Sequence, residues 1–187
     1  MARSFRLTAD GGSRGNPGPA GYGAVVTEGG KIVAELFDVI GVATNNVAEY
    51  SGLLAGLSHI HQLDAQATVE VAMDSKLVVE QMSGRWQIKH ADMRDLAKQC
   101  RAAHDPSLVT YSWIPRDENS HADRLANKAL DGGSAHKPIA VVQQNFLTDR
   151  LRSAEVPTFI YFIRHGETVL TPERRFSGTG SIDPELM

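Results

Sequence analysis

Residues 5–27 read FRLTADGGSRGNPGPAGYGAVVT, two short apolar runs on either side of a stretch rich in glycine and proline. In the first run, apolar and polar residues alternate from Phe5 to Ala9, which is the pattern of a half-buried strand. Asp10 follows, and Gly11-Gly12 then breaks the pattern, so we expect Asp10 to close this strand. The second run, Tyr22 to Thr27, predicts another strand.

The rest of the chain alternates strand and helix signals. A third strand at residues 31–40 follows Glu28-Gly29-Gly30, a composition typical of a tight hairpin. Helical spacing of apolar residues predicts one helix capped by Asn45 or Asn46, a short one capped by Ser75, one over about residues 91–103, and a last one that carries Ala122. Further strands are expected at residues 68–73 and 108–114. This order predicts an α/β fold, a mixed sheet packed by helices.

Four acidic residues lie at the ends of predicted elements: Asp10, Glu49, Asp74 and Asp123. Asp10 and Asp74 each follow a strand. Glu49 is expected in the first turn of its helix, and Asp123 borders the apolar stripe of the last one. Sites in open sheets gather at such positions, and carboxylates that converge there repel one another unless cations are bound. The four acids predict a divalent-metal site, although each alone is also explained as a turn or helix-start residue.

Composition narrows the class of protein. The chain has 187 residues, a net charge of −3 and one cysteine, Cys100, which is expected in the core. No apolar run approaches membrane-spanning length and the N-terminus lacks a secretory signal, so we expect a cytoplasmic protein. The charge excludes a dominant basic patch. The sequence does not predict zinc, because no ligand pattern with a cysteine includes His59, His61, His90 or His104.

Four motifs occur together in order: residues 10–23, Thr44-Asn45-Asn46-Val47-Ala48-Glu49, Met73-Asp74-Ser75 and residues 119–127. With them, residues 3–131 resemble type 1 ribonuclease H. The resemblance implies a ribonuclease H-like fold with a five-stranded mixed sheet flanked by helices. It also implies that two Mg²⁺ ions, or Mn²⁺ as a substitute, are held at the positions matching Asp10, Glu49, Asp74 and Asp123.

The implied reaction is hydrolysis of the RNA strand of an RNA/DNA hybrid, leaving 5′-phosphate and 3′-hydroxyl ends. Magnesium prefers hard oxygen ligands, so a few carboxylates and a substrate phosphate complete its shell. Double-stranded RNA is a second candidate substrate, and a non-catalytic hybrid-binding module is the alternative function. We expect a monomer.

Several polar residues are expected to contact the substrate. The glycine-rich loop lets backbone amides approach a nucleic-acid strand, with Asn16 at its edge. Asn side chains and helix-start amides bind 2′-hydroxyls and phosphates. The expected substrate-binding residues are Asn16, Thr44, Asn45, Asn46 and Lys76.

Two features depart from the best-known bacterial form. Residues 84–90 lead straight into the next helix, in place of a basic protruding handle. Arg116 stands where that form has a catalytic histidine, and an arginine assists departure of the product phosphate but cannot shuttle a proton near neutral pH. We therefore expect Arg116 to be an auxiliary residue and His121 to be a surface histidine.

The C-terminal third has a different character. Residues 132–157 are expected to form a linker after a ribonuclease H domain at residues 1–131. Residues 158–187, which include Arg164-His165-Gly166, resemble the opening of the histidine phosphatase (phosphoglycerate mutase-like) superfamily. There His165 would take the phosphoryl group and Arg164 would bind it. We expect an incomplete domain, as in a truncated bifunctional protein of the actinobacterial kind, with phosphatase activity only in a longer chain.

Overall fold

A computed structural model describes residues 3–132. Within them the strands are β1 Ser4–Ser13, β2 Gly18–Glu28, β3 Lys31–Ala43, β4 Thr68–Met73 and β5 Val109–Trp113. The helices are α1 Asn45–Leu63, α2 Lys76–Met82, α3 Ala91–Ala103 and α4 Ser120–Leu130, with 3-10 turns η1 Pro106–Leu108 and η2 Arg116–Asn119. The rest of the predicted linker and the phosphatase-like segment, with Arg164 and His165, lie outside the described residues.

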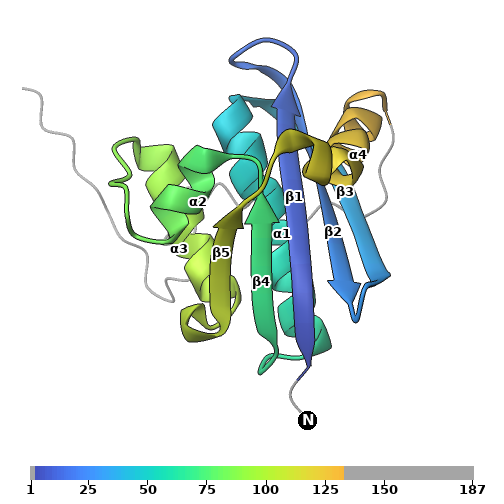
Figure 1. Ribbon diagram of the computed structural model, residues 1–187. Helices are drawn as coiled ribbons and strands as arrows, with labels where there is room; N and C mark the ends of the chain where they lie inside the picture. The colour runs from blue at the N-terminus through green and yellow to red at the C-terminus, as the bar shows by residue number, and fades with distance from the viewer. Residues whose placement is uncertain (1–2, 133–187) are drawn as a thin grey trace, which may run out of the picture. The chain divides into compact units, whose positions relative to one another are not determined.

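The five strands form one mixed sheet in the order β3-β2-β1-β4-β5 (Figure 1). β1, β2 and β3 form an antiparallel meander, and the predicted hairpin joins β2 to β3 through Gly29 and Gly30, both with positive φ. β4 runs parallel to both β1 and β5. The predicted five-stranded mixed sheet is therefore confirmed.

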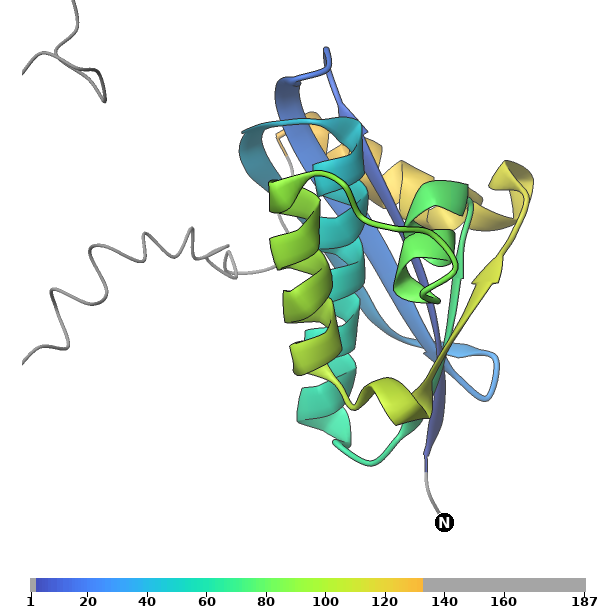
Figure 2. The ribbon, with the colours of Figure 1, turned by 90° about the vertical axis from the view of Figure 1, so that its left-hand side faces the viewer.

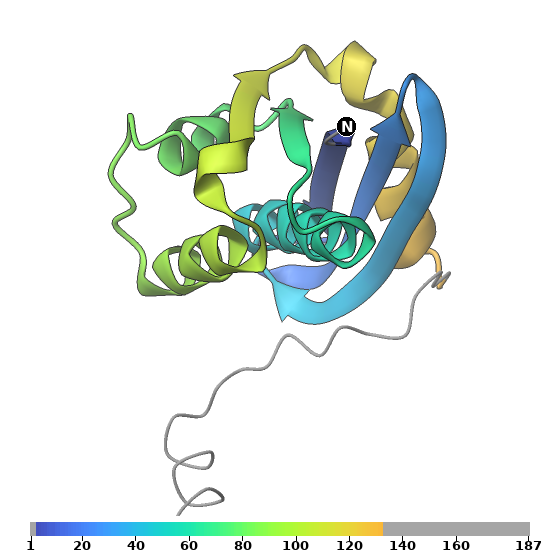
Figure 3. The ribbon, with the colours of Figure 1, turned by 90° about the horizontal axis from the view of Figure 1, so that it is seen from below.

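Helices cover both faces of the sheet. α1 and α3 run side by side against one face, and α4 lies on the other (Figures 2 and 3). On β1, Leu7 and Ala9 face the α1 layer, so the alternate residue Asp10 faces α4. Because side chains alternate along β1, the carboxylate of Asp10 lies on the sheet face opposite the main core.

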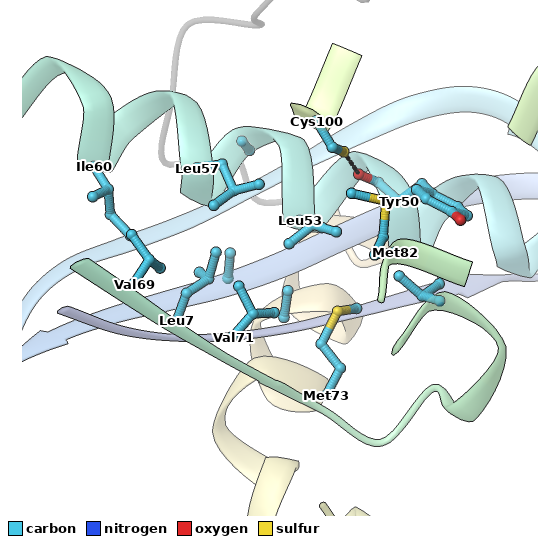
Figure 4. Packing of buried hydrophobic residues seen from close by; sticks show 14 of the residues in the cluster. Leu7, Tyr50, Leu53, Leu57, Ile60, Val69, Val71, Met73, Met82 and Cys100 are labelled. Atoms are coloured by element: carbon cyan, nitrogen blue, oxygen red, sulfur yellow. Dashed lines mark hydrogen bonds between the residues drawn. The ribbon is translucent and has the colours of Figure 1, made fainter. Parts of the chain in front are cut away.

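The main core lies between α1 and the sheet (Figure 4). Side chains from α1, β1 and β4 interdigitate there, including Leu7, Tyr50, Leu53, Leu57, Ile60, Val69, Val71 and Met73. Cys100 of α3 is buried in this cluster, and its Sγ donates to the backbone oxygen of Tyr50 at 3.8 Å. Burial raises the pKa of Cys100 to about 12, so the thiol stays protonated. The prediction of a core cysteine is confirmed.

Two glycines on neighbouring strands let helices approach the acidic residues. A Cβ at Gly11 would collide with the backbone of α1 at Glu49, and a Cβ at Gly23 would collide with the backbone of α4. Asp10 precedes Gly11 and pairs with Gly23 across β1 and β2. The helices that carry Glu49 and Asp123 therefore pack close to Asp10.

Three local predictions are wrong. Asp10 does not close β1, because residues 11–13 continue the antiparallel pairing with β2 up to Ser13. α1 is capped by Thr44, whose Oγ1 accepts from the backbone N–H of Val47 at 3.4 Å, and not by Asn45 or Asn46. The helix consequently starts at Asn45, and Glu49 lies beyond its first turn, where the helix dipole stabilises it less.

Other boundaries agree closely with the predictions. β4 and α3 have the expected residues, and Ser75 caps α2 by accepting from the backbone N–H of Val78 at 3.4 Å. Between α2 and α3 the chain forms a short connection without a further helix, as expected from the missing handle. Among residues 3–132, no helix combines the length and apolar character needed to cross a bilayer.

Candidate active site

One pocket of about 290 Å³ brings the four predicted carboxylates together. Asp10 comes from β1, Glu49 from α1, Asp74 from the end of β4, and Asp123 from the first turn of α4. The other lining residues are Gly11, Gly12, Ser13, Arg14, Asn45, Arg116, Ala126, Asn127 and Leu130. Four acids that are distant in sequence thus face a shared space containing two arginines.

Burial, together with neighbouring acids, raises the pKa of two residues in this pocket, Asp10 and Glu49. Burial and the charge of Asp74 raise the pKa of Asp10 to about 6, against a hydrogen bond from the Gly11 backbone N–H at 2.8 Å. Burial also raises the pKa of Glu49 to about 7, although the hydroxyl of Ser75 donates to Glu49 Oε2 at 2.6 Å. The charges of Asp10 and Asp74 add to this shift. The pocket therefore holds ionised carboxylates at a free-energy cost.

Asp74 is held by donors from β5 and η2. Asn119 Nδ2 donates to Asp74 Oδ1 at 2.6 Å and to the Ala9 backbone oxygen at 2.9 Å. The indole N–H of Trp113 donates to the Asp74 backbone oxygen at 3.0 Å. Asn119 is buried, and its own Oδ1 has no hydrogen-bond partner among the described residues. Asn119 thus ties the carboxylate of Asp74 to the backbone of β1.

Asp123 is oriented by groups before and within α4. Arg116 Nη2 donates to Asp123 Oδ1 at 3.0 Å, and this hydrogen bond raises the pKa of Arg116. Asn127, one turn further along, donates to Asp123 Oδ2 at 3.1 Å. Arg116 itself is largely exposed at the pocket. A permanently charged guanidinium therefore lies beside the acids, where the sequence predicts an auxiliary residue.

The donor chemistry of the pocket fits a hard divalent cation. All four acids offer carboxylate oxygens. Burial and the charges of neighbouring acids raise the pKa values of Asp10 and Glu49, and a bound cation offsets both effects. Within residues 3–132, no three acid, histidine or cysteine side chains already form a cage around an ion position. Magnesium usually binds through one or two carboxylates plus waters and substrate phosphates, so a closed cage is not needed.

The predicted substrate-binding residues are partly gathered here. Asn45 lines the pocket, and its backbone N–H donates to Asn16 Oδ1 at 3.2 Å, which ties the β1–β2 loop to the start of α1. Thr44 serves as the cap of α1, and Asn46 and Lys76 lie in the first turns of α1 and α2 without lining the pocket. His121 lies outside the pocket, with Nε2 2.6 Å from Glu35 Oε1, as expected of a surface histidine.

The residues that orient the acids are absent from the sequence-based site. The sequence predicts Ser75 as a helix cap alone and Asn119 and Asn127 as parts of a motif alone, and it assigns no role to Trp113. Of these residues, Asn127 carries a local signal, because it lies one helical turn after the acid that it contacts, Asp123. Ser75 and Asn119 contact acids that lie 26 and 45 positions away in the sequence.

Comparison with known proteins shows the family to which this chain belongs. The profile of the family described as "Reverse transcriptase-like" matches residues 8–129. In the solved N-terminal RNase H domain of Rv2228c from Mycobacterium tuberculosis, 53% of residues are identical, with a TM-score of 0.66, covering 70% of this chain and 96% of that one. The chain belongs to the ribonuclease H family. The five-stranded sheet and the helices on both its faces match those of ribonuclease H structures.

Two further relatives extend the comparison. LC11-RNase H1, solved in complex with an RNA/DNA hybrid, is 36% identical with a TM-score of 0.64, covering 68% of this chain and 97% of that one. Bifunctional protein Rv2228c of M. tuberculosis is 47% identical over 185 residues, which cover 94% of this chain and 50% of that protein. The chain thus spans about half the length of this and two similar curated relatives.

Proposed function

We propose that this ribonuclease H domain, residues 1–131, is a metal-dependent endoribonuclease that hydrolyses the RNA strand of RNA/DNA hybrids. The observation that carries the proposal is the convergence of four carboxylates from four separate elements on one pocket beside Arg116. The likeness to LC11-RNase H1, a protein solved with a hybrid, supports the substrate class. The intact set of acids favours catalysis over a non-catalytic hybrid-binding module.

Two Mg²⁺ ions, with Mn²⁺ as a substitute, are proposed as the cofactor. The carboxylates that would hold the ions are those of Asp10, Glu49, Asp74 and Asp123. When bound, such a pair supplies an activated water and stabilises the leaving oxygen, which gives 5′-phosphate and 3′-hydroxyl products. The half-buried setting of Asp10 and Glu49 supports this assignment, because ionised carboxylates there gain most from a cation.

Hydrogen bonds from neighbouring side chains fix the orientation of the carboxylates. Ser75 fixes one oxygen of Glu49, Asn119 fixes one of Asp74, and Asn127 fixes one of Asp123. Because each acid keeps a set orientation before substrate arrives, little reorganisation is needed during the reaction. Arg116, which remains charged, is proposed to assist departure of the product phosphate.

The substrate assignment is tested by offering the protein one labelled RNA strand in two duplexes. The strand is annealed to complementary DNA or to complementary RNA, and a DNA duplex of the same sequence serves as a control. We expect magnesium-dependent cuts in the RNA of the hybrid and an intact DNA duplex. Cleavage of the RNA duplex would add a second substrate, whereas binding of the hybrid without turnover at any metal concentration would refute the enzymatic proposal.

Asn119→Ala is expected to lower the hybrid cleavage rate by about 10- to 100-fold, the usual effect of removing a group that orients a metal ligand. The variant leaves Asp74 Oδ1 and the Ala9 carbonyl without their donor. The Mg²⁺ concentration for half-maximal activity should rise as well, which a purely structural weakening would not cause. Steady-state kinetics over a magnesium series, at a temperature where the variant is folded, provide the check. An unchanged magnesium requirement would argue against this role of Asn119.

Arg116→Ala is expected to lower kcat by about tenfold, because a charge-assisted contact to phosphate is lost while the four carboxylates remain. Arg116→Lys should recover part of the rate, since it keeps the charge without the planar fork. In rapid-quench experiments, the single-turnover cleavage rate of Arg116→Ala should be unchanged, which would assign the loss of kcat to product release. If single-turnover cleavage slowed as much as kcat, the residue would act in the chemical step instead.

We also propose that the protein is a cytoplasmic monomer and that residues 158–187 begin a histidine phosphatase domain after a linker at 132–157. The 185-residue match to a protein named bifunctional supports a second activity in a longer chain, with Arg164 and His165 at its phosphate site. Phosphate release from a simple ester, lost on His165→Ala, would test this in a chain of the relatives' length.

A further inference from the structure

Arg14 is a second arginine at the acidic pocket, and the roles described above leave it unused. It lies in the loop between β1 and β2 and lines the same pocket as Asp10 and Asp123. Its guanidinium Nη2 forms an ion pair with Asp131 Oδ1, directly after the end of α4. Both side chains are more than half exposed. The positively charged guanidinium of Arg14 thus lies at the pocket and is paired with an acid of the same domain, Asp131.

The backbone beneath Arg14 is held in place independently of its side chain. The Arg14 backbone N–H donates to the Pro19 backbone oxygen at 2.7 Å, which closes the loop. The contact between Asn16 and Asn45 joins the same loop to α1. Because these bonds do not involve the guanidinium, the side chain can change partner while the loop stays in position.

The ion pair with Asp131 is of a kind that a phosphate displaces readily. Exposed ion pairs contribute little to stability, since solvent screens them and both side chains lose rotamer freedom. An arginine bound to a phosphate in bidentate geometry forms a stronger, charge-assisted contact. A nucleic-acid strand entering the pocket brings a row of phosphates past the four acids. Arg14 is therefore placed to exchange Asp131 for one of them.

Arg14 and Arg116 lie near different positions along α4, and therefore along a nucleic-acid strand in the pocket. Arg116 pairs with Asp123 in the first turn of α4, and Arg14 pairs with Asp131 at the other end of that helix. At 1.5 Å rise per residue, the two aspartates are about 12 Å apart along α4. The two arginines are therefore paired with acids at opposite ends of α4.

We propose that Arg14 binds a backbone phosphate of the strand that enters the acidic pocket, and that Asp131 is an internal competitor that this phosphate displaces. The inference rests on the proposed hybrid cleavage. It predicts opposite effects from breaking the ion pair on its two sides. Removing Arg14 removes a phosphate contact, whereas removing the charge of Asp131 frees Arg14 from its competitor.

The test measures binding of a fluorescein-labelled RNA/DNA hybrid by anisotropy, in the full chain carrying Asp74→Asn to block turnover. Arg14→Ala should weaken binding by about 5- to 10-fold and reduce the slope of log affinity against log salt by about 1. Asp131→Asn should tighten binding by about 2- to 5-fold. In the double variant, Asp131→Asn should have no further effect, because its action passes through Arg14.

Arg6→Ala is the matched control, because Arg6 forms a similar exposed ion pair with Glu70 near the other end of β1. It should leave affinity and salt slope unchanged. If Arg14→Ala and Asp131→Asn weakened binding equally, the pair would be a structural brace and the inference would fail. The inference would also fail alone if the unmodified chain cleaved hybrids and Arg14→Ala bound them normally. Absence of both binding and cleavage in the unmodified chain would instead overturn the proposed function.

Discussion

Asp74→Asn is expected to lower the rate of hybrid cleavage on the order of 10³-fold, equivalent to about 4 kcal/mol of transition-state stabilisation. The amide has the shape of the carboxylate, and its oxygen can still accept from Asn119 Nδ2. The change therefore removes a negative charge from the proposed metal site while the surrounding hydrogen bonds persist. Hybrid binding should remain, because one less acid lies near the phosphates.

Single-turnover cleavage and anisotropy on the same preparations separate the two effects. Asp117→Asn provides the matched control, since Asp117 is an exposed acid of η2 that does not line the pocket. It should cleave like the unmodified protein. Near-normal activity of Asp74→Asn at saturating Mg²⁺ would remove Asp74 from the metal site and with it much of the support for the proposed function.

Asp10→Asn is expected to stabilise the ion-free protein by about 3 kcal/mol at pH 8. The folded-state pKa of Asp10, about 6, lies above its ordinary value of 3.8. The folded protein therefore holds this proton more tightly than the unfolded chain does, and stability is lost as the pH rises through that window. Glu49, with a pKa of about 7, acts in the same direction. The amide removes the contribution of Asp10.

Urea unfolding in EDTA at several pH values provides the measurement. The advantage of Asp10→Asn over the unmodified protein should be largest above pH 7 and disappear near pH 4. Asp95→Asn, which alters an exposed acid on α3, should show no such trend. Adding Mg²⁺ should stabilise the unmodified protein more than Asp10→Asn, because ion binding offsets the repulsion in the pocket. A pH-independent difference would mean that the carboxylate is not strained by its neighbours.

Sequence periodicity predicted most of the fold, because its elements are long and their core positions regular. β4 and α3 agree with the predicted ranges. The errors arose where pairing overrides local composition. Gly11 and Gly12 look like a turn, yet β2 lies alongside and extends β1 through them. Likewise, Thr44 rather than an asparagine caps α1 because its backbone has the extended cap conformation.

The four acids were also predictable, because each sits in a short motif. Most of their supporting contacts were not, since they join residues that are distant in sequence. Asn119 reaches Asp74 across 45 positions and the backbone of Ala9 across 110. The partnership of Arg14 with Asp131 spans almost the whole domain. Local patterns identify the groups that react, whereas the tertiary structure alone reveals the groups that orient them.

The central claim is that the acidic pocket cuts the RNA strand of a hybrid by using bound divalent ions. The most direct test follows a 5′-labelled RNA strand, annealed to DNA, during a titration from EDTA into Mg²⁺, with analysis of the product ends. We predict no product in EDTA, and fragments with 3′-hydroxyl and 5′-phosphate ends once magnesium is present. Cleavage in EDTA, or products ending in a 2′,3′-cyclic phosphate, would contradict the account, because the attacking group would then be the neighbouring 2′-hydroxyl rather than water.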